Sequence, residues 1–329
     1  MCNTKVSSFF LTLAPFLLFI TLFLLFGVLS DRFLQFQTLE NIVKQASYIG
    51  IVAVGMTFVL LTAGIDLSVG SNMYLSAICA GLLIRDFGAP VGLALIGCLT
   101  VGFFFGAFNA FGVIKLHIIP FVVTLSTLVA GRGLGLLLTK SHAVLFPDGI
   151  IKMGSISLFG LVPLPIAIFI AVVIGSYLFL SRTSVGRQIY AVGNDIEAAK
   201  KAGIDTDRIT AVAYIASGLL AALGGFVSVA QLGNVNAGFG DGIEFKAIAA
   251  AVLGGTSLYG GIGSVFPGTV LGALLIQMVS TGLVFLQVDL YLQPLIAAGI
   301  IFLAVFLDGI RNKQLIKLSR RFIRVEEET

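Results

Sequence analysis

The chain has 329 residues, of which 58% are apolar and 11% are charged, and its net charge is +4 at pH 7. Soluble domains carry about 25% charged residues, so this composition, with a mean hydropathy of +1.07, excludes an ordinary soluble protein and predicts an all-α membrane protein. The three cysteines are odd in number and lack CxxC spacing, which argues against a disulfide framework or a zinc site.

Apolar runs of about 20 residues predict the membrane-spanning helices. We expect about ten of them, at 9–29, 46–63, 67–84, 89–113, 119–139, 161–181, 210–230, 243–260, 265–286 and 291–310. The third run begins with polar residues, so it fits a broken or re-entrant helix, and 243–263 is similarly irregular. We therefore predict one transmembrane domain over 1–310 with a loop at 182–209, followed by a basic and then acidic tail at 311–329.

The distribution of basic residues predicts the orientation. Most of the 20 lysines and arginines fall on one side of the predicted bundle. That side includes Lys5, Lys115, Arg182, Arg187, Lys200, Lys201, Arg208 and the basic part of the tail. Because cytoplasmic loops are enriched in Lys and Arg, both termini are predicted to be cytoplasmic.

Arg132 is a charge inside the run 119–139, where the insertion cost is about 2.5–3.5 kcal/mol. The surrounding apolar residues can offset this cost. Arg132 either faces the bundle, bound to carbonyls or to a carboxylate such as Asp66 or Glu244, or belongs to a substrate pathway. Glu244 and Lys246, at a segment boundary, are expected to extend toward the interface.

Asp66 is the second residue of interest before the run 67–84. It either caps a helix that starts at Leu67 or helps to gate a pathway. Further candidates for a pathway or gate are Ser68, Gly70, Asn109 and Thr256. Residues 63–70 and 254–261 share Gly, Leu and Gly at matching positions, which predicts a weak internal repeat of the kind found in transporters.

Several kinds of chemistry lack their motifs. No Gly-Lys dipeptide occurs, so the phosphate-binding P-loop is absent. The chain has only two histidines, His117 and His142, and they are too far apart to form the zinc-binding HExxH motif. The segment from Gly238 to Asp241 looks like the GxGD motif of intramembrane aspartyl proteases, but that family's Tyr-Asp partner does not occur, and a turn is the better interpretation. The chain is predicted to be no enzyme, to bind no cofactor or metal, and to have no nucleic-acid partner.

The loop 182–209 carries signals for a short helix. Asn194 and Glu197 are spaced as in a capping box, alanines follow, and Gly203 fits a left-handed helix end. The alternative is a surface hairpin that only connects two spans.

Three blocks carry a family resemblance. Glu197-Ala198-Ala199 with Gly203 resembles the EAA loop of permease subunits in binding-protein-dependent ABC importers. Residues 186–193, which precede this EAA stretch, together with 50–71 and 247–272, are similar in order and spacing to the ribose, xylose and arabinose permease family. The chain departs from the family pattern at Asn194-Asp195, where a small residue usually precedes Asn, so the cap can shift by one residue.

This resemblance implies a multi-pass permease of the bacterial inner membrane that imports a small neutral solute, most often a monosaccharide. A nucleoside, an autoinducer-type sugar, a branched-chain amino acid and an ion-coupled secondary transporter remain the alternatives. The implied partners are an ATPase subunit, which uses ATP and Mg, an external substrate-binding protein, and a second permease subunit, identical or paralogous, in the lipid bilayer. The ATPase contact would involve Asn194, Asp195, Glu197, Ala198, Ala199 and Gly203.

Overall fold

The computed structural model describes residues 2–158, 160–299, 302 and 306, with side chains from residue 16 onward, and these residues are mostly helical. The helices are α1 (Cys2–Leu29), α2 (Phe36–Leu61), α3 (Val69–Phe87), α4 (Val91–Ile114), α5 (Pro120–Thr139), α6 (Asp148–Met153), α7 (Leu164–Arg182), α8 (Ser184–Asn194), α9 (Ile196–Lys201), α10 (Thr206–Leu232), α11 (Ile243–Leu253) and α12 (Val270–Phe285), which follows a π-helical turn at Val265–Thr269. The predicted tail 311–329 lies outside the described residues.

Six of the described helices are long and apolar enough to cross a membrane: α2, α4, α5, α7, α10 and the stretch Val265–Phe285. The predicted number of about ten is therefore not confirmed. The expectation of a span at 243–260 is wrong because α11 has only 11 residues, about half the length that a bilayer core of about 30 Å requires. α3 is long enough but polar at both ends, and the run 291–310 is only partly described.

α2 and α10 form the centre of the bundle, and α10 packs against α2, α3 and α4. Glycines allow these close contacts. A Cβ at Gly102 or Gly106 of α4 would overlap backbone atoms of α10, so this Gly-xxx-Gly pair lets the two helices pack closely. Most residues of α4, α5 and α7 are half-buried or exposed rather than buried, as expected for the outside of a membrane bundle.

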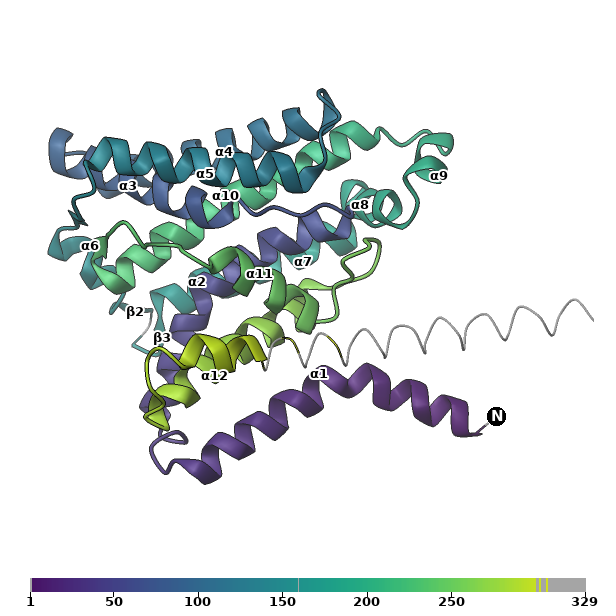
Figure 1. Cartoon of the computed structure of the whole chain (residues 1–329), viewed down its shortest axis with the longest axis horizontal. Coiled ribbons are helices and arrows are strands. Elements are labelled where there is room, and N and C mark those ends of the chain that lie inside the picture. The colour runs from purple at the N-terminus through teal and green to yellow at the C-terminus, as the bar shows by residue number, and fades with distance from the viewer. Residues whose placement is uncertain (1, 159, 300–301, 303–305, 307–329) are drawn as a thin grey trace, which may run out of the picture.

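The two ends of the bundle carry different structures (Figure 1). At one end are α6 and the short strands, β1 (Val144–Leu145) paired antiparallel with β4 (Asn234–Val235), and β2 (Ser157–Leu158) paired antiparallel with β3 (Val162–Pro163). At the other end are α8 and α9, which replace the single helix predicted for the loop 182–209.

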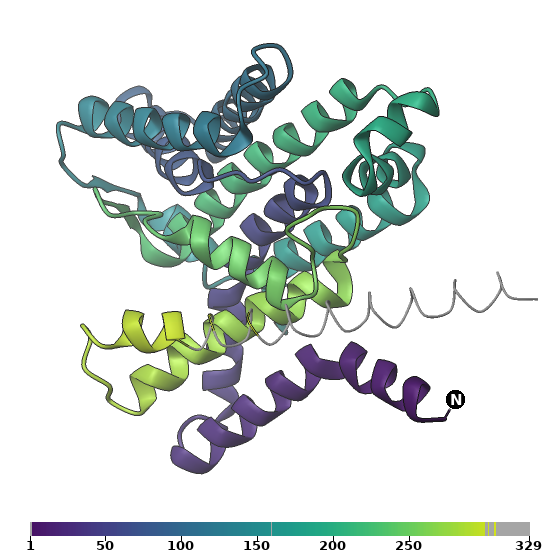
Figure 2. The same cartoon turned by 45° about the vertical axis from the view of Figure 1, so that its right-hand side comes forward.

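Two segments interrupt the helical bundle, residues 62–68 between α2 and α3 and residues 254–264 after α11. The first was expected to be irregular and the second partly so. The two segments touch: the Gly261 N–H donates to the Leu61 carbonyl (3.0 Å), and Gly260 lies against Ala63. Figure 2 shows the loop after α11, in light green, close to α8 in the second view.

Candidate functional site

Asp66 is the centre of a buried polar cluster in the segment 62–68. The side chain is 1% exposed, and its Oδ1 accepts hydrogen bonds from the Ser68 N–H (3.0 Å), the Ser68 hydroxyl (2.6 Å) and Asn109 Nδ2 (3.4 Å). Its Oδ2 accepts from the Ser217 hydroxyl of α10 (2.8 Å). These donors are all uncharged, so they hold Asp66 without an ion pair.

Asn109 connects this cluster to two further helices. It lies on α4, donates to the Ser68 hydroxyl (2.8 Å), and accepts a hydrogen bond from the Thr127 hydroxyl of α5 (2.7 Å). The carbonyl of Ile65 accepts from Tyr214 of α10 (3.4 Å). The irregular segment is therefore fixed by side chains from α4, α5 and α10, as buried backbone without helical hydrogen bonds requires.

The role predicted for Asp66 needs one correction. α3 begins at Val69 and its N-cap residue is Ser68, so Asp66 does not cap a helix that starts at Leu67. Asp66 instead binds the Ser68 N–H two residues ahead, in the manner of an Asx turn. The Asp66 carboxylate therefore stabilises the turn of the chain that precedes α3.

Arg132, near the middle of α5, faces the bundle. Its guanidinium donates to the carbonyls of Ala237 (3.2 Å) and Phe239 (2.7 Å), lies over the Tyr74 ring at 4.7 Å, and forms an ion pair with Asp241. Binding to carbonyls was one of the two expectations. The expected carboxylates were wrong, because the loop 236–242 brings Asp241, and not Asp66 or Glu244, within bonding distance.

Three further candidates, Glu244, Gly70 and Thr256, do not join the hydrogen-bonded cluster around Asp66. Glu244 is 7% exposed, so the prediction that it extends toward the interface is wrong: α11 buries it against Gly70 in the first turn of α3. Among the described buried side chains, Glu244 Oε2 and Thr256 Oγ1 have no hydrogen-bond partner. Gly70 lacks room for a side chain, since a Cβ would overlap Glu244 and the Gly240 carbonyl.

The short helix α9 forms with the end signals that the sequence predicted, shifted by one residue at its start. Asp195, not Asn194, is the N-cap, and its Oδ1 accepts from the N–H groups of Glu197 (2.9 Å) and Ala198 (3.0 Å). Asn194 is the last residue of α8. Gly203 has a φ of +80°, which confirms the predicted left-handed helix end.

The predicted contact residues of this loop point in two directions. Asn194, Asp195, Glu197, Ala198 and Gly203 are exposed, while Ala199 is buried. Ala199 packs in an apolar cluster with Ile189 and Val192 of α8, Leu61 at the end of α2, and Val265. α8 and α9 thus dock on the bundle through one face and present the other.

Ser217, Thr127 and Tyr214 are cluster residues that sequence reasoning missed. Each lies within an apolar helix, where a single hydroxyl carries no signal of its partner. Among the described residues, no three His, Cys, Asp or Glu side chains gather where they would hold a metal ion.

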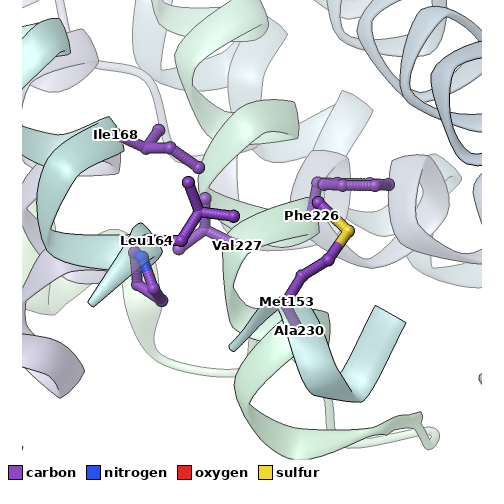
Figure 3. A pocket seen from close by; sticks show the side chains of 7 residues that line it. Met153, Leu164, Ile168, Phe226, Val227 and Ala230 are labelled. Carbon is purple, nitrogen blue, oxygen red and sulfur yellow. The ribbon is translucent and has the colours of Figure 1, made fainter. Parts of the chain in front are cut away.

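A small pocket between α6, α7 and α10 is lined only by apolar side chains (Figure 3). Met153 and Phe226 lie on one side of it, opposite Leu164, Ile168 and Val227. Such a lining offers no hydrogen bond that would orient a polar solute.

A comparison with known protein families finds a match that covers most of this helical bundle. The family described as branched-chain amino acid transport system / permease component matches residues 38–306. The chain belongs to this permease family. The resemblance to permease subunits of binding-protein-dependent ABC importers is confirmed, and the chain is a multi-pass permease of the bacterial inner membrane and not a catalytic enzyme.

Curated permeases extend this similarity over most of the chain. The autoinducer 2 import system permease protein LsrC of Enterobacter sp. (strain 638) is 36% identical, covering 94% of this chain and 91% of the relative. The ribose import permease protein RbsC of Escherichia coli (strain K12) is 37% identical, over 86% and 89%. The D-allose transport system permease protein AlsC of the same strain is 36% identical, over 88% and 89%. No solved structure matches the chain.

Proposed function

We propose that this permease imports a monosaccharide or a sugar-like solute. The observation that carries the proposal is that relatives named for ribose, D-allose and autoinducer 2 match nearly the whole chain at 36 to 37% identity. A neutral polyhydroxylated solute needs hydrogen-bond partners and not charges. The hydroxyl and amide groups around Asp66 form an uncharged hydrogen-bonded cluster within the bundle, and we assign Asp66, Ser68 and Asn109 to the pathway or its gate.

The energy comes, in this proposal, from a partner ATPase that binds ATP and Mg and docks on α9. The exposed face formed by Asn194, Asp195, Glu197 and Ala198 is the contact surface, with Gly203 ending the helix. α9 carries Glu197 near its start and Lys200 and Lys201 in its last turn, so its side-chain charges favour the helix dipole at both ends. A helix stabilised in this way stays folded when a partner subunit binds it and moves.

The remaining parts of the proposal concern orientation and assembly. The enrichment of Lys and Arg around α8 and α9 supports a cytoplasmic location for this end and for both termini. A substrate-binding protein docks at the end that carries α6 and the short strands. A second permease subunit completes the pathway, and the irregular segments 62–68 and 254–264, with their shared residues, support a weak internal repeat.

Uptake in reconstituted vesicles tests the proposal. The permease is co-expressed with the ATPase and the binding protein encoded by neighbouring genes, and uptake of labelled ribose, D-allose and leucine is measured with ATP inside the vesicles. We expect uptake of a sugar and no uptake of leucine. Leucine uptake would contradict the sugar assignment, and ATP-independent uptake driven by an ion gradient would favour a secondary transporter.

The role of α9 is tested with Glu197→Lys and Gly203→Val. The first reverses a charge on the exposed face, and the second places a β-branched residue at a φ of +80°, where L side chains are strained. Both variants should insert normally because neither residue lies in a spanning helix, yet both should lower copurification of the ATPase and uptake together. Wild-type ATPase retention and wild-type uptake in both variants would show that the loop is only a connector.

A further inference from the structure

Three separate chain segments meet at the end of α8, and two of them, α8 and the segment 254–264, contribute glycines to the contact. Gly193, in the last turn of α8, lies against the Leu61 carbonyl at the end of α2 and against the N–H of Gly261. Gly260 contacts the Gly193 carbonyl and Ala63, while Gly261 lies against Asn194. We call Leu61, Ala63, Gly193, Gly260 and Gly261 the glycine junction.

The junction is bonded as well as packed. The last carbonyls of a helix have no partner within the helix, and the Leu61 carbonyl finds one in the Gly261 N–H (3.0 Å). The Tyr190 hydroxyl of α8 donates to the Gly263 carbonyl (3.2 Å). The end of α2, the segment 254–264 and α8 are therefore tied at one point.

Gly193 has no room for a side chain. A Cβ at this position would overlap the Leu61 carbonyl and crowd the Gly261 N–H, so even alanine would separate α8 from the other two segments. By contrast, the space around Gly203 and Gly175 is open, and the backbone at Gly175, in α7, has no left-handed φ. Gly193 is therefore a position at which even a methyl group disturbs the contact, whereas Gly175 tolerates one.

The junction leads directly to the buried polar cluster. Ala63 and Asp66 belong to the same irregular segment, and the carbonyl of Ile65 and the carboxylate of Asp66 are bound by α10. On the other side, α9 follows α8 after the single residue Asp195 and shares its apolar cluster with Leu61. A displacement of α9 would reach the segment 62–68 through backbone contacts without a flexible side chain between them.

Resting on the proposed docking of an ATPase at α9, we propose that the glycine junction is the mechanical link that carries the motion of α8 and α9 to both irregular segments. Gly193 is its positioning residue. Separating α8 from Leu61 and Gly261 leaves the ATPase bound but uncouples ATP hydrolysis from transport. This outcome differs from that of a change on α9, which acts on docking.

The experiment compares Gly193→Ala with Gly175→Ala in the complete complex with ATPase and binding protein. Three quantities are measured in vesicles: ATPase retained on the permease, ATP hydrolysis, and uptake of ribose or D-allose, whichever the wild type transports. We expect Gly193→Ala to retain the ATPase within twofold of wild type and to transport at least tenfold less sugar per ATP hydrolysed. Gly175→Ala should match the wild type in all three.

Tyr190→Phe is the second variant and removes only the hydrogen bond to Gly263. It should lower the amount of sugar transported per ATP about threefold while ATPase retention stays normal. This result tests the proposal even if Gly193→Ala does not fold. The proposal would be overturned if Tyr190→Phe transports as much sugar per ATP as the wild type and Gly193→Ala either does the same or misfolds. Loss of ATPase binding in Gly193→Ala would also overturn it. Failure of the wild-type complex to bind the ATPase or to transport a sugar would instead refute the proposed function.

Discussion

Asp66→Ala should destabilise the permease strongly because it removes the acceptor of a buried network. The Ser68 N–H donates only to Asp66 in the described hydrogen bonds, and it cannot turn toward another partner. A buried donor left without a partner costs about 1–3 kcal/mol. The Ser217 hydroxyl can return to a carbonyl of its own helix, and the Ser68 hydroxyl still accepts from Asn109. We therefore expect a loss of about 1–3 kcal/mol, the cost of the one donor that is left without a partner.

Asp66→Asn should behave differently. The Asn Oδ1 can accept the hydrogen bonds from Ser68 and Asn109, and its amide can donate to the Ser217 hydroxyl, which accepts as readily as it donates. All four contacts survive, so the change in the free energy of unfolding should stay below about 1 kcal/mol, and uptake should remain above half of wild type.

The assay is thermal unfolding of the purified complex in detergent, together with uptake in vesicles. Asp66→Ala should lower the melting temperature by several degrees relative to Asp66→Asn. Ser126→Ala is the matched control, because it removes an exposed hydroxyl that bonds only within its own helix. A stable Asp66→Asn protein that reaches the membrane but does not transport would refute this reasoning and show that the negative charge itself acts in gating.

Three further predictions concern orientation, Arg132 and glycine packing. In a cysteine-free background, Lys201→Cys should react with an impermeant thiol reagent only after the membrane is opened, whereas Leu161→Cys should react in intact spheroplasts; the reverse pattern would invert the topology. Arg132→Met should cost about 1–3 kcal/mol in thermal unfolding, because the part-buried Phe239 carbonyl loses its donor whereas the exposed Ala237 carbonyl can bind water. Asp241→Asn should cost under about 1 kcal/mol, since this carboxylate is largely exposed; equal effects would make the ion pair the dominant contact. Gly272→Val should lower the melting temperature more than Gly175→Val, because a Cβ at Gly272 overlaps the Ala250 carbonyl whereas Gly175 faces open space; similar shifts would contradict the packing argument.

The sequence alone determined the membrane class, six of the spans and the ends of α9. These features depend on local quantities: apolar length decides whether a helix can cross a bilayer, and a capping carboxylate or a left-handed glycine acts within a few residues of its position. The expected spans at 89–113, 119–139 and 265–286 therefore agree with α4, α5 and Val265–Phe285 to within about two residues. The cap differed by one residue, because Asn194 and Asp195 are both good caps and only the turn between α8 and α9 selects Asp195.

Only the tertiary structure decided which polar groups meet. The carboxylate that pairs with Arg132 was predicted to be Asp66 or Glu244, yet the loop after β4 brings Asp241 to it. The Asp66 carboxylate accepts a hydrogen bond from the hydroxyl of Ser217, which lies 151 residues away in the sequence. Gly193 packs against Leu61 and Gly261, which belong to two other segments. A hydroxyl or a glycine in an apolar helix looks the same in sequence whether it faces lipid or a partner, because its role depends on the rotation of the helix and on the neighbours that packing places against it.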